Sequence, residues 1–176
     1  MKEITIMEIN MKKVSKLLTQ ATVSLAALMV VSSSQAQLLN HKDMTASIAM
    51  TMAQTAIATC KNNGYVISVS VVGRNGEIIV QVRGDDTGMH TVENSFRKAY
   101  TARTFRVPSG DIVTRLKNDP SFPLIHLSNV IANQGGLPIK FGDETIGGIG
   151  ISGAPGGDKD EACAKAALDK VADQLK

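Results

Sequence analysis

Two tight turns constrain this chain more than any other feature, because each of them joins a pair of strand-forming segments. The turn Arg74-Asn75-Gly76 contains an Asn-Gly pair, which favours the left-handed backbone angles of a β-hairpin. A second turn, Gly142-Asp143, also lies between two strand-forming segments. The four predicted strands are residues 65–72, 77–82, 137–141 and 145–151. Because hairpins join antiparallel neighbours and parallel strands need long crossovers, the sequence predicts an antiparallel sheet.

Helical periodicity fills the segments around the hairpins. Apolar residues recur every three or four positions before the first hairpin and between the two hairpins. The predicted helices are residues 42–62, 91–105, 111–118 and the stretch from 158 onward. The order is therefore α–ββ–αα–ββ–α, which is an α+β fold. The last strand, TIGGIGI, contains three glycines, and these indicate a bulge or a close approach of another backbone.

The first 36 residues have the layout of a secretory signal peptide. A basic segment with Lys12, Lys13 and Lys16 precedes the apolar run 17–31, and small residues up to Ala36 provide a cleavage site. The alternative is a membrane anchor, but the run is shorter than the ~20 residues that span a bilayer. Because the first ten residues are acidic, Met11 is an alternative start. We expect a single domain of residues 37–176, periplasmic or secreted, with no stable membrane insertion after processing.

Charge and composition exclude two classes of protein. Of the formal net charge of +3, residues 1–36 carry +2, so the expected mature domain is close to neutral. A neutral domain lacks the basic surface that attracts nucleic acid, and we expect no nucleic-acid partner. A hydrophobic content of 43% is too high for a disordered chain.

The two cysteines, Cys60 and Cys163, allow two interpretations. In an oxidising compartment they are able to form a disulfide that closes a long loop. Alternatively, they are two small buried residues on helices. With no CxxC motif and no adjacent histidine, these two residues alone do not indicate a metal site.

The loop 83–90 is the first candidate site, because it concentrates polar groups between a strand and a helix. Arg83 suits a bidentate bond to a ligand carboxylate, and His90 suits iron ligation. Asp85 and Asp86 lie between them. The alternative is a solvated loop in which an aspartate caps the helix. On the helix that follows, Lys98 belongs to a group of basic residues that suit an anionic ligand or, alternatively, form a solvated face.

The glycine-rich segment 148–158 is the second candidate. It leads into a helix, and free backbone N–H groups in such a loop are able to hold a carboxylate or a phosphate. It lacks the GxxxxGK[ST] pattern of a P-loop. The alternative is a structural connection, because Asp158 and Asp160 would repel an anion.

Three sequence blocks resemble the GlcG/HbpS family of haem-binding and haem-degrading proteins. They are VSVVGRNGEIIVQVRGDD, FRKAYTA and GGLPIKFGDETIGGIGISGAPGGDKDEACAKAAL. The resemblance covers essentially all of the expected mature chain. Arg83 and Asp85 match the family's R-x-D motif, Lys98 its K-A pair and Gly153 its C-terminal block. The chain departs from the family at Asp86, where glycine is usual.

The resemblance implies a profilin-like α+β fold, with an antiparallel sheet of about five strands flanked by helices. It also implies a symmetric homo-oligomer, often an octamer, and haem as the cofactor of exported members. Some members act with a partner sensor histidine kinase. We therefore expect a haem carrier, buffer or redox-sensor accessory. Its site would contain His90 as the iron ligand, with Arg83, Asp85, Lys98 and Gly153 around a haem or another small anionic ligand.

Two other functions remain open from the sequence. One is an enzyme acting on haem or on a small carboxylate, with Lys98 or His90 as the acid–base group. The other is a structural oligomer or sensor partner that binds no small ligand. No motif in the sequence fixes a reaction.

Overall fold

The computed structural model describes residues 39–176, so the expected signal peptide and its cleavage site lie outside the described residues. The helices are α2 (Ala46–Asn62), α3 (His90–Phe105), α4 (Ser109–Asn118) and α5 (Gly157–Val171). The strands are β1 (Ser68–Val72), β2 (Ile78–Val82), β3 (Gly136–Phe141) and β4 (Glu144–Ser152). Two short 3-10 helices, η1 (Pro123–His126) and η2 (Ala172–Gln174), complete the set. None of the helices in this part of the chain is long and apolar enough to cross a membrane.

The strands form one antiparallel sheet in the order β2-β1-β4-β3. Both predicted hairpins are present, β1 with β2 and β3 with β4. The two hairpins join where β1 pairs with β4, with Val69 opposite Ile151. The fold is α+β, as expected, but the sheet has four strands within residues 39–176 and not about five. The expected number came from the family resemblance, whereas the sequence itself supplied only the four strands that are observed.

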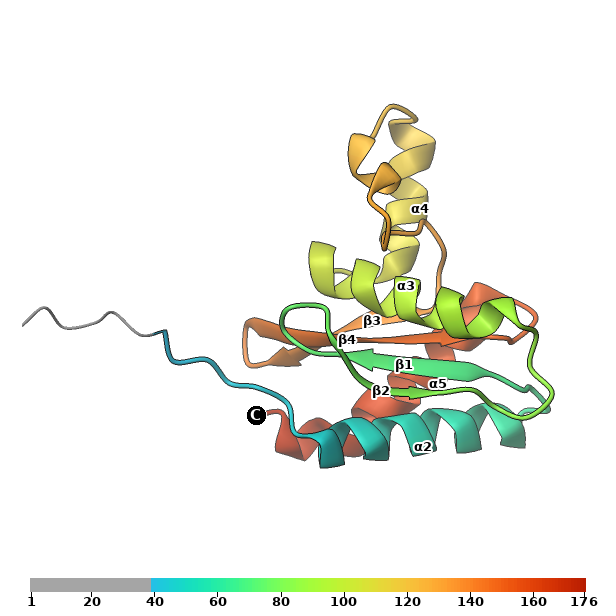
Figure 1. The fold of residues 1–176 in the computed structure, drawn as a ribbon, viewed down its shortest axis with the longest axis vertical. Coiled ribbons are helices and arrows are strands. Elements are labelled where there is room, and N and C mark those ends of the chain that lie inside the picture. The colour runs from blue at the N-terminus through green and yellow to red at the C-terminus, as the bar shows by residue number, and fades with distance from the viewer. Residues whose placement is uncertain (1–38) are drawn as a thin grey trace, which may run out of the picture. The chain divides into compact units, whose positions relative to one another are not determined.

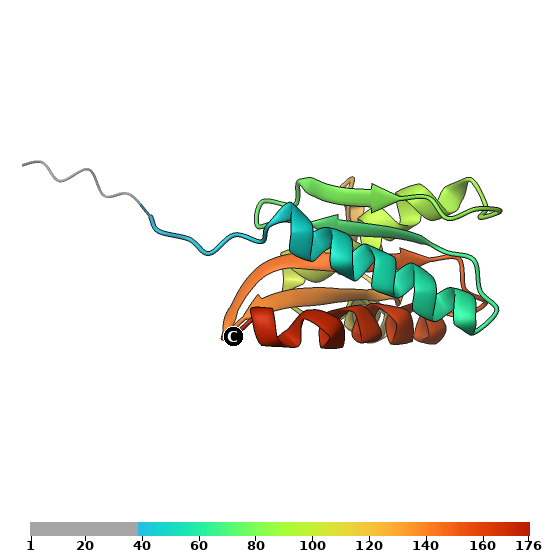
Figure 2. The ribbon, with the colours of Figure 1, turned by 90° about the horizontal axis from the view of Figure 1, so that it is seen from below.

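The helices cover the two faces of the sheet differently. Figure 1 shows α3 on one face, with α2 and α5 on the other, and Figure 2 shows α2 and α5 side by side. The main apolar core lies between the sheet and the α2–α5 pair. Its fully buried members include Met52, Ala53, Ala56, Val69, Val71, Ile149, Ile151, Ala164, Ala167 and Val171.

The face under α3 is buried as well, although β1 contributes two serines, Ser68 and Ser70, to it. Ser68 shares a hydrogen bond with Thr91 (2.8 Å between hydroxyl oxygens), and Ser70 shares one with Ser95 (2.8 Å). The alternation of serine and valine along β1 therefore separates two buried faces, one apolar and one with paired hydroxyl groups. Pairing removes the penalty of burying these hydroxyl groups.

Glycines of β4 allow α3 to approach the sheet at backbone distance. A Cβ atom added at Gly150 would overlap the carbonyl oxygen of Ser95, and one at Gly148 would overlap that of Ala99. The sequence predicts a bulge or a close backbone approach at TIGGIGI: the close approach is present at Gly148 and Gly150, and the pairing with β3 also shifts register between Ile139 and Lys140.

Cys60 and Cys163 form a disulfide, which decides between the two interpretations left open by the sequence. The bond joins the end of α2 to α5, across a sequence separation of 103 residues. Both cysteines are buried. The cross-link therefore fixes the two helices that cover the main core.

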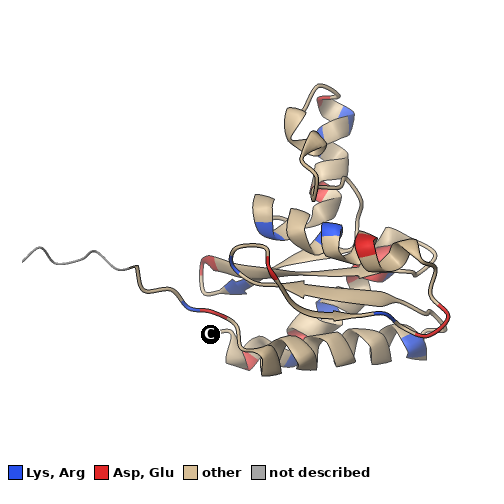
Figure 3. Cartoon of the chain, viewed as in Figure 1, with Lys and Arg blue, Asp and Glu red and all other residues tan. Residues whose placement is uncertain are grey.

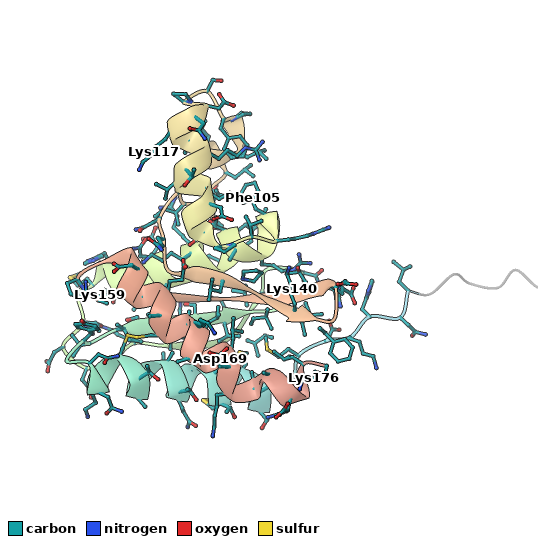
Figure 4. All side chains as sticks on the ribbon, turned by 180° about the vertical axis from the view of Figure 1, so that it is seen from behind. Phe105, Lys117, Lys140, Lys159, Asp169 and Lys176 are labelled. Carbon is teal, nitrogen blue, oxygen red and sulfur yellow. A yellow bond between two sulfur atoms is a disulfide. The ribbon has the colours of Figure 1, made fainter. Side chains whose placement is uncertain are left out.

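Helix α4 projects away from the sheet (Figure 1), and Figure 4 shows Phe105 near its base and Lys117 further along it. The aromatic rings of Phe105 and Phe122 lie 5.9 Å apart, and the Arg115 guanidinium stacks 3.9 Å from the Phe122 ring centroid. These contacts hold Phe122, which lies on the segment that leads from α4 back to β3, against α3 and α4.

Candidate functional site

A hollow of about 490 Å³ lies at the start of α3, and it brings together three of the five predicted site residues. These are His90, Lys98 and Gly153. The walls are completed by residues of the loop before α3, of α3 itself and of the β4–α5 connection: Asp86, Thr87, Gly88, Thr91, Asn94, Ser152, Ala154, Pro155, Gly156, Gly157 and Asp160, together with Val66 and Asn133. The two segments that the sequence singled out, 83–90 and 148–158, therefore face each other across one cavity.

His90 is the first residue of α3, and its side chain is exposed. Gly88 lies close against its ring, because an added Cβ would fall 2.8 Å from the imidazole Cε1. Gly153 lies on the opposite wall with φ +134°, and an added Cβ would overlap the Val66 carbonyl oxygen. The hollow therefore contains one imidazole that is free to ligate a metal, and the glycines of its lining leave space for a ligand next to that imidazole.

Lys98 occupies the floor of the hollow, but its ammonium group is bound within the protein. Its Nζ donates to Asp160 Oδ2 (2.7 Å) and to the Ile151 carbonyl oxygen (3.0 Å). The two charged side chains are 2% and 4% exposed. The sequence predicts that Lys98 presents a positive charge to a ligand, whereas in the structure Asp160 neutralises this charge.

The Asp160 carboxyl has a second partner, the backbone N–H of Ala154, which donates to Oδ1 (3.0 Å). Burial raises the pKa of this carboxyl, although the Lys98 ammonium and the Ala154 N–H both oppose the shift. Gly135 makes room for the pair: at φ +121°, an added Cβ would lie 2.9 Å from Lys98 Nζ and 2.7 Å from Asp160 Cβ. The pair ties α3, β4 and α5 together beneath the cavity.

Arg83 and Asp85 lie on a different hollow, of about 430 Å³, with Lys61 and Tyr65. Asp86 and Val66 line both hollows, so the two adjoin. One guanidinium nitrogen of Arg83 donates to the Thr87 carbonyl oxygen (2.9 Å), which closes the loop 83–87. The structure therefore divides the predicted site residues between two neighbouring hollows.

Asp86, where the chain departs from the family's usual glycine, has φ +61°. Aspartate tolerates this left-handed conformation better than most residues other than glycine. The loop therefore keeps a glycine-type backbone at this position and adds a carboxylate to the boundary between the two hollows.

Polar residues that the sequence analysis did not select also line the first hollow. Asn94 donates its side-chain amide to the Ser152 hydroxyl (3.1 Å). Thr87 and Thr91 lie within hydrogen-bond distance of Ser68 (3.3 and 2.8 Å). Their sequence signal is weak, because isolated serines, threonines and asparagines are common in helices and strands. Charged residues of both signs are spread over the helices (Figure 3), and among residues 39–176 no three histidine, cysteine or acidic residues form a metal-binding group.

Comparison with known proteins identifies the family. The model of the family described as haem degrading protein HbpS-like matches residues 44–169. This range includes every strand and both hollows. The chain belongs to the HbpS-like family.

Three relatives show how far the similarity extends. An uncharacterised 15.0 kDa protein of the dhaT–dhaS intergenic region of Citrobacter freundii is 30% identical over 72% of this chain and 90% of its own. A double mutant of Streptomyces reticuli HbpS is 31% identical, with a TM-score of 0.74 over 80% of this chain and 95% of that chain. The PduOC–haem complex is 23% identical, with a TM-score of 0.66 over 72% and 93% of the two chains. The last comparison shows a shared fold.

Proposed function

We propose that this protein binds haem in the hollow at the start of α3, with His90 as the protein ligand of the iron. The observation that carries the proposal is the exposed His90 imidazole in a cavity of about 490 Å³, in a chain that belongs to the HbpS-like family. The volume is in the usual range for small-molecule sites, about 300–1,000 Å³. Histidine is a common axial ligand of haem iron, and the bound haem would supply its redox and ligand-binding chemistry.

The residues around His90 fit a flat, partly exposed ligand. Gly88 and Gly153 leave backbone exposed on opposite walls, and Asn94 with Ser152 provides a paired polar edge. No tryptophan is present in the chain, and no tyrosine or phenylalanine lines this hollow. The chain therefore holds the ligand through the imidazole and polar contacts more than through an aromatic sandwich.

For the propionate groups we assign Arg83 in place of Lys98. Lys98 already has two acceptors, whereas Arg83 is exposed beside the adjoining hollow and uses one of its nitrogens for Thr87. Asp85 lies on the same loop, and its negative charge would repel a second carboxylate of the ligand. A ligand that extends from His90 past Asp86 would bring its acidic groups towards Arg83.

A second candidate function is haem degradation, which the description of the family names. It requires haem to bind first and a reductant to be present. The chain supplies His90 as the one titratable imidazole of this hollow. A time course of the haem absorption band distinguishes stable binding from degradation.

We further propose that the protein is exported to the periplasm or secreted, after cleavage of residues 1–36, and acts as a single domain of residues 37–176. The Cys60–Cys163 disulfide supports this proposal, since such bonds persist in oxidising compartments. A profilin-like fold, a symmetric homo-oligomer such as an octamer, and a sensor kinase partner are part of the same proposal. The family resemblance supports them.

The test is a hemin titration followed by absorption spectroscopy. We expect a saturable shift of the Soret band in the wild-type protein, and an altered or lost band in His90→Ala. His126→Ala is the matched control, because His126 is also exposed but lies on η1, away from the hollow. Absence of a spectral change at micromolar hemin would refute the proposal. Loss of the band over time with a reductant would identify degradation, and a constant band would identify a carrier or sensor.

A further inference from the structure

A second, smaller hollow lies at the opposite end of α3, and its lining is strongly basic. It measures about 140 Å³ and lies between the last turns of α3 and the β1–β2 turn. Its lining residues are Arg74, Asn75, Gly76, Tyr100, Arg103 and Thr104. It contains two arginines and no carboxylate. Arg103 follows His90 by thirteen positions, which is about 20 Å along a helix, so the two sites are independent.

One of the two arginines is held firmly by the protein. Arg74 donates to Asp43 (3.2 Å), to Glu144 (2.5 Å) and to the Lys42 carbonyl oxygen (2.5 Å). Its side chain is 13% exposed. These bonds fix the guanidinium group as one wall of the hollow.

The other arginine lacks such partners. Arg103 is partly buried, its Nε is inaccessible to solvent, and within residues 39–176 this Nε has no hydrogen-bond acceptor. A buried donor without an acceptor is costly, and charged donors more so. Because Nε is covered, an anion in the hollow would reach Arg103 through the remainder of its guanidinium group, which lines the hollow.

Charged groups of both signs surround Arg103. Burial and the neighbouring charges of Arg106 and Arg74 lower the pKa of Arg103, and only Glu77 and Glu144 oppose them. Glu144 is paired with Arg74, whereas Glu77 accepts the backbone N–H of Asn75 (2.9 Å) and keeps its negative charge. Within the lining, the guanidinium of Arg103 is therefore the cationic group that has no bonded carboxylate among residues 39–176, whereas Arg74 is paired with Asp43 and Glu144.

The shape of the hollow restricts the size of an anion. Tyr100 closes one side, because its ring lies so near Gly76 that an added Cβ would be 2.6 Å from Tyr Cε2. The Asn75 amide lines the hollow on the side of the turn, and Arg103 lines it on the side of the helix. Donors on two sides suit a tetrahedral group with three or four oxygens better than a planar carboxylate, which one guanidinium fork satisfies.

We propose that this hollow is a binding site for a phosphate group, either inorganic phosphate or the phosphate of a small monoester, with Arg103 as its main ligand. The guanidinium of Arg103 binds the phosphate oxygens. Arg74, held by Asp43 and Glu144, forms the fixed wall of the site, and the side-chain amide of Asn75 supplies a further donor. This site is separate from the proposed haem site.

The experiment is calorimetric titration of the purified protein with inorganic phosphate, glycerol 3-phosphate, acetate and chloride at constant ionic strength. We expect saturable binding of at least one phosphate compound, and clearly weaker binding of acetate and chloride. The stronger of the two phosphate compounds identifies the source of the group. Arg103→Gln should weaken binding by about tenfold or more, as expected for a lost bond to a charged group.

Arg106→Gln is the matched control, because it removes one neighbouring positive charge from the same helix end without changing the lining of the hollow. We expect it to weaken binding by about fivefold at most, the effect of an exposed charge. His90→Ala should leave phosphate binding unchanged. The proposal is overturned if phosphate binds no better than chloride or acetate, or if Arg103→Gln and Arg106→Gln weaken it equally while circular dichroism shows that both are folded.

Discussion

Replacing Lys98 with methionine tests whether the buried ion pair is structural. The substitution nearly preserves the length of the side chain but removes the ammonium group. Of its two partners, the Asp160 carboxyl then keeps only the backbone N–H of Ala154. Because both side chains of the pair are at least 96% buried, solvent cannot replace the lost ammonium. Removing one partner of such a pair costs about 3–5 kcal/mol.

This cost is a large part of the ~5–15 kcal/mol by which a domain is normally stable. Urea denaturation followed by circular dichroism measures it. With a slope of about 2 kcal/mol per molar urea, the midpoint of Lys98→Met should fall by roughly 1.5–2.5 M. The double variant Lys98→Met/Asp160→Asn should recover much of the loss, because no uncompensated charge then remains.

Lys159→Met is the control for this experiment. Lys159 is adjacent to Asp160 in sequence, but its side chain is 41% exposed, so its loss should change stability by no more than about 0.5 kcal/mol. A decrease of less than ~1 kcal/mol in the free energy of unfolding of Lys98→Met would contradict the reasoning, because an unpaired buried carboxylate destabilises a fold by more than that. A stable Lys98→Met variant that no longer binds hemin would instead assign Lys98 to the ligand.

Three further predictions follow from the same structure. Burial raises the pKa of Asp160 in the folded state, so the folded state binds this proton more tightly than the unfolded chain. This group's contribution to stability should therefore decrease as the pH rises from about 4 through the raised pKa, and Asp160→Asn should abolish that slope in urea titrations across this pH range. Reduction of the Cys60–Cys163 bond, which closes a loop of 103 residues, should cost about 4–5 kcal/mol, measured by urea unfolding with and without reductant; free thiols in the native oxidised protein would contradict it. Gly150→Ala should cost about 1–3 kcal/mol and lower the melting temperature, because its methyl group overlaps the α3 backbone. Gly110→Ala, whose new methyl group would meet only the flexible Gln134 side chain, should be milder, and equal effects would refute the overlap argument.

The hairpins were predictable because their turns have a local chemistry. Asn75-Gly76 and Gly142-Asp143 specify their backbone angles within a few residues, and the flanking segments have the periodicity of strands. The pairing of β1 with β4, which joins the two hairpins into one sheet, depends on contacts between segments about eighty residues apart. No local pattern specifies that pairing.

The site was predictable in part for the same reason. His90 and Gly153 each mark the junction of a strand or loop with a helix, and the antiparallel sheet brings these junctions to one edge. The Lys98–Asp160 pair was not predictable, because the partners are 62 residues apart and each is typical of a solvated helix. Gly135 is the residue that accommodates the pair, but in the sequence it is simply one of fifteen glycines.

The bare stretch of β4 under α3 has a consequence for how this protein tolerates sequence change. The backbone of α3 lies directly against Gly148 and Gly150, and the facing helix residues Ser95 and Ala99 are fully buried, so a larger side chain at any of these positions meets occupied space. A mutational library that enlarges either partner singly should be depleted at these four positions. Compensation by a second substitution is also blocked, because the obstacle is main chain and cannot be made smaller. Variation compatible with folding is therefore expected at the two ends of α3, where the hollow beside His90 and the hollow beside Arg103 lie.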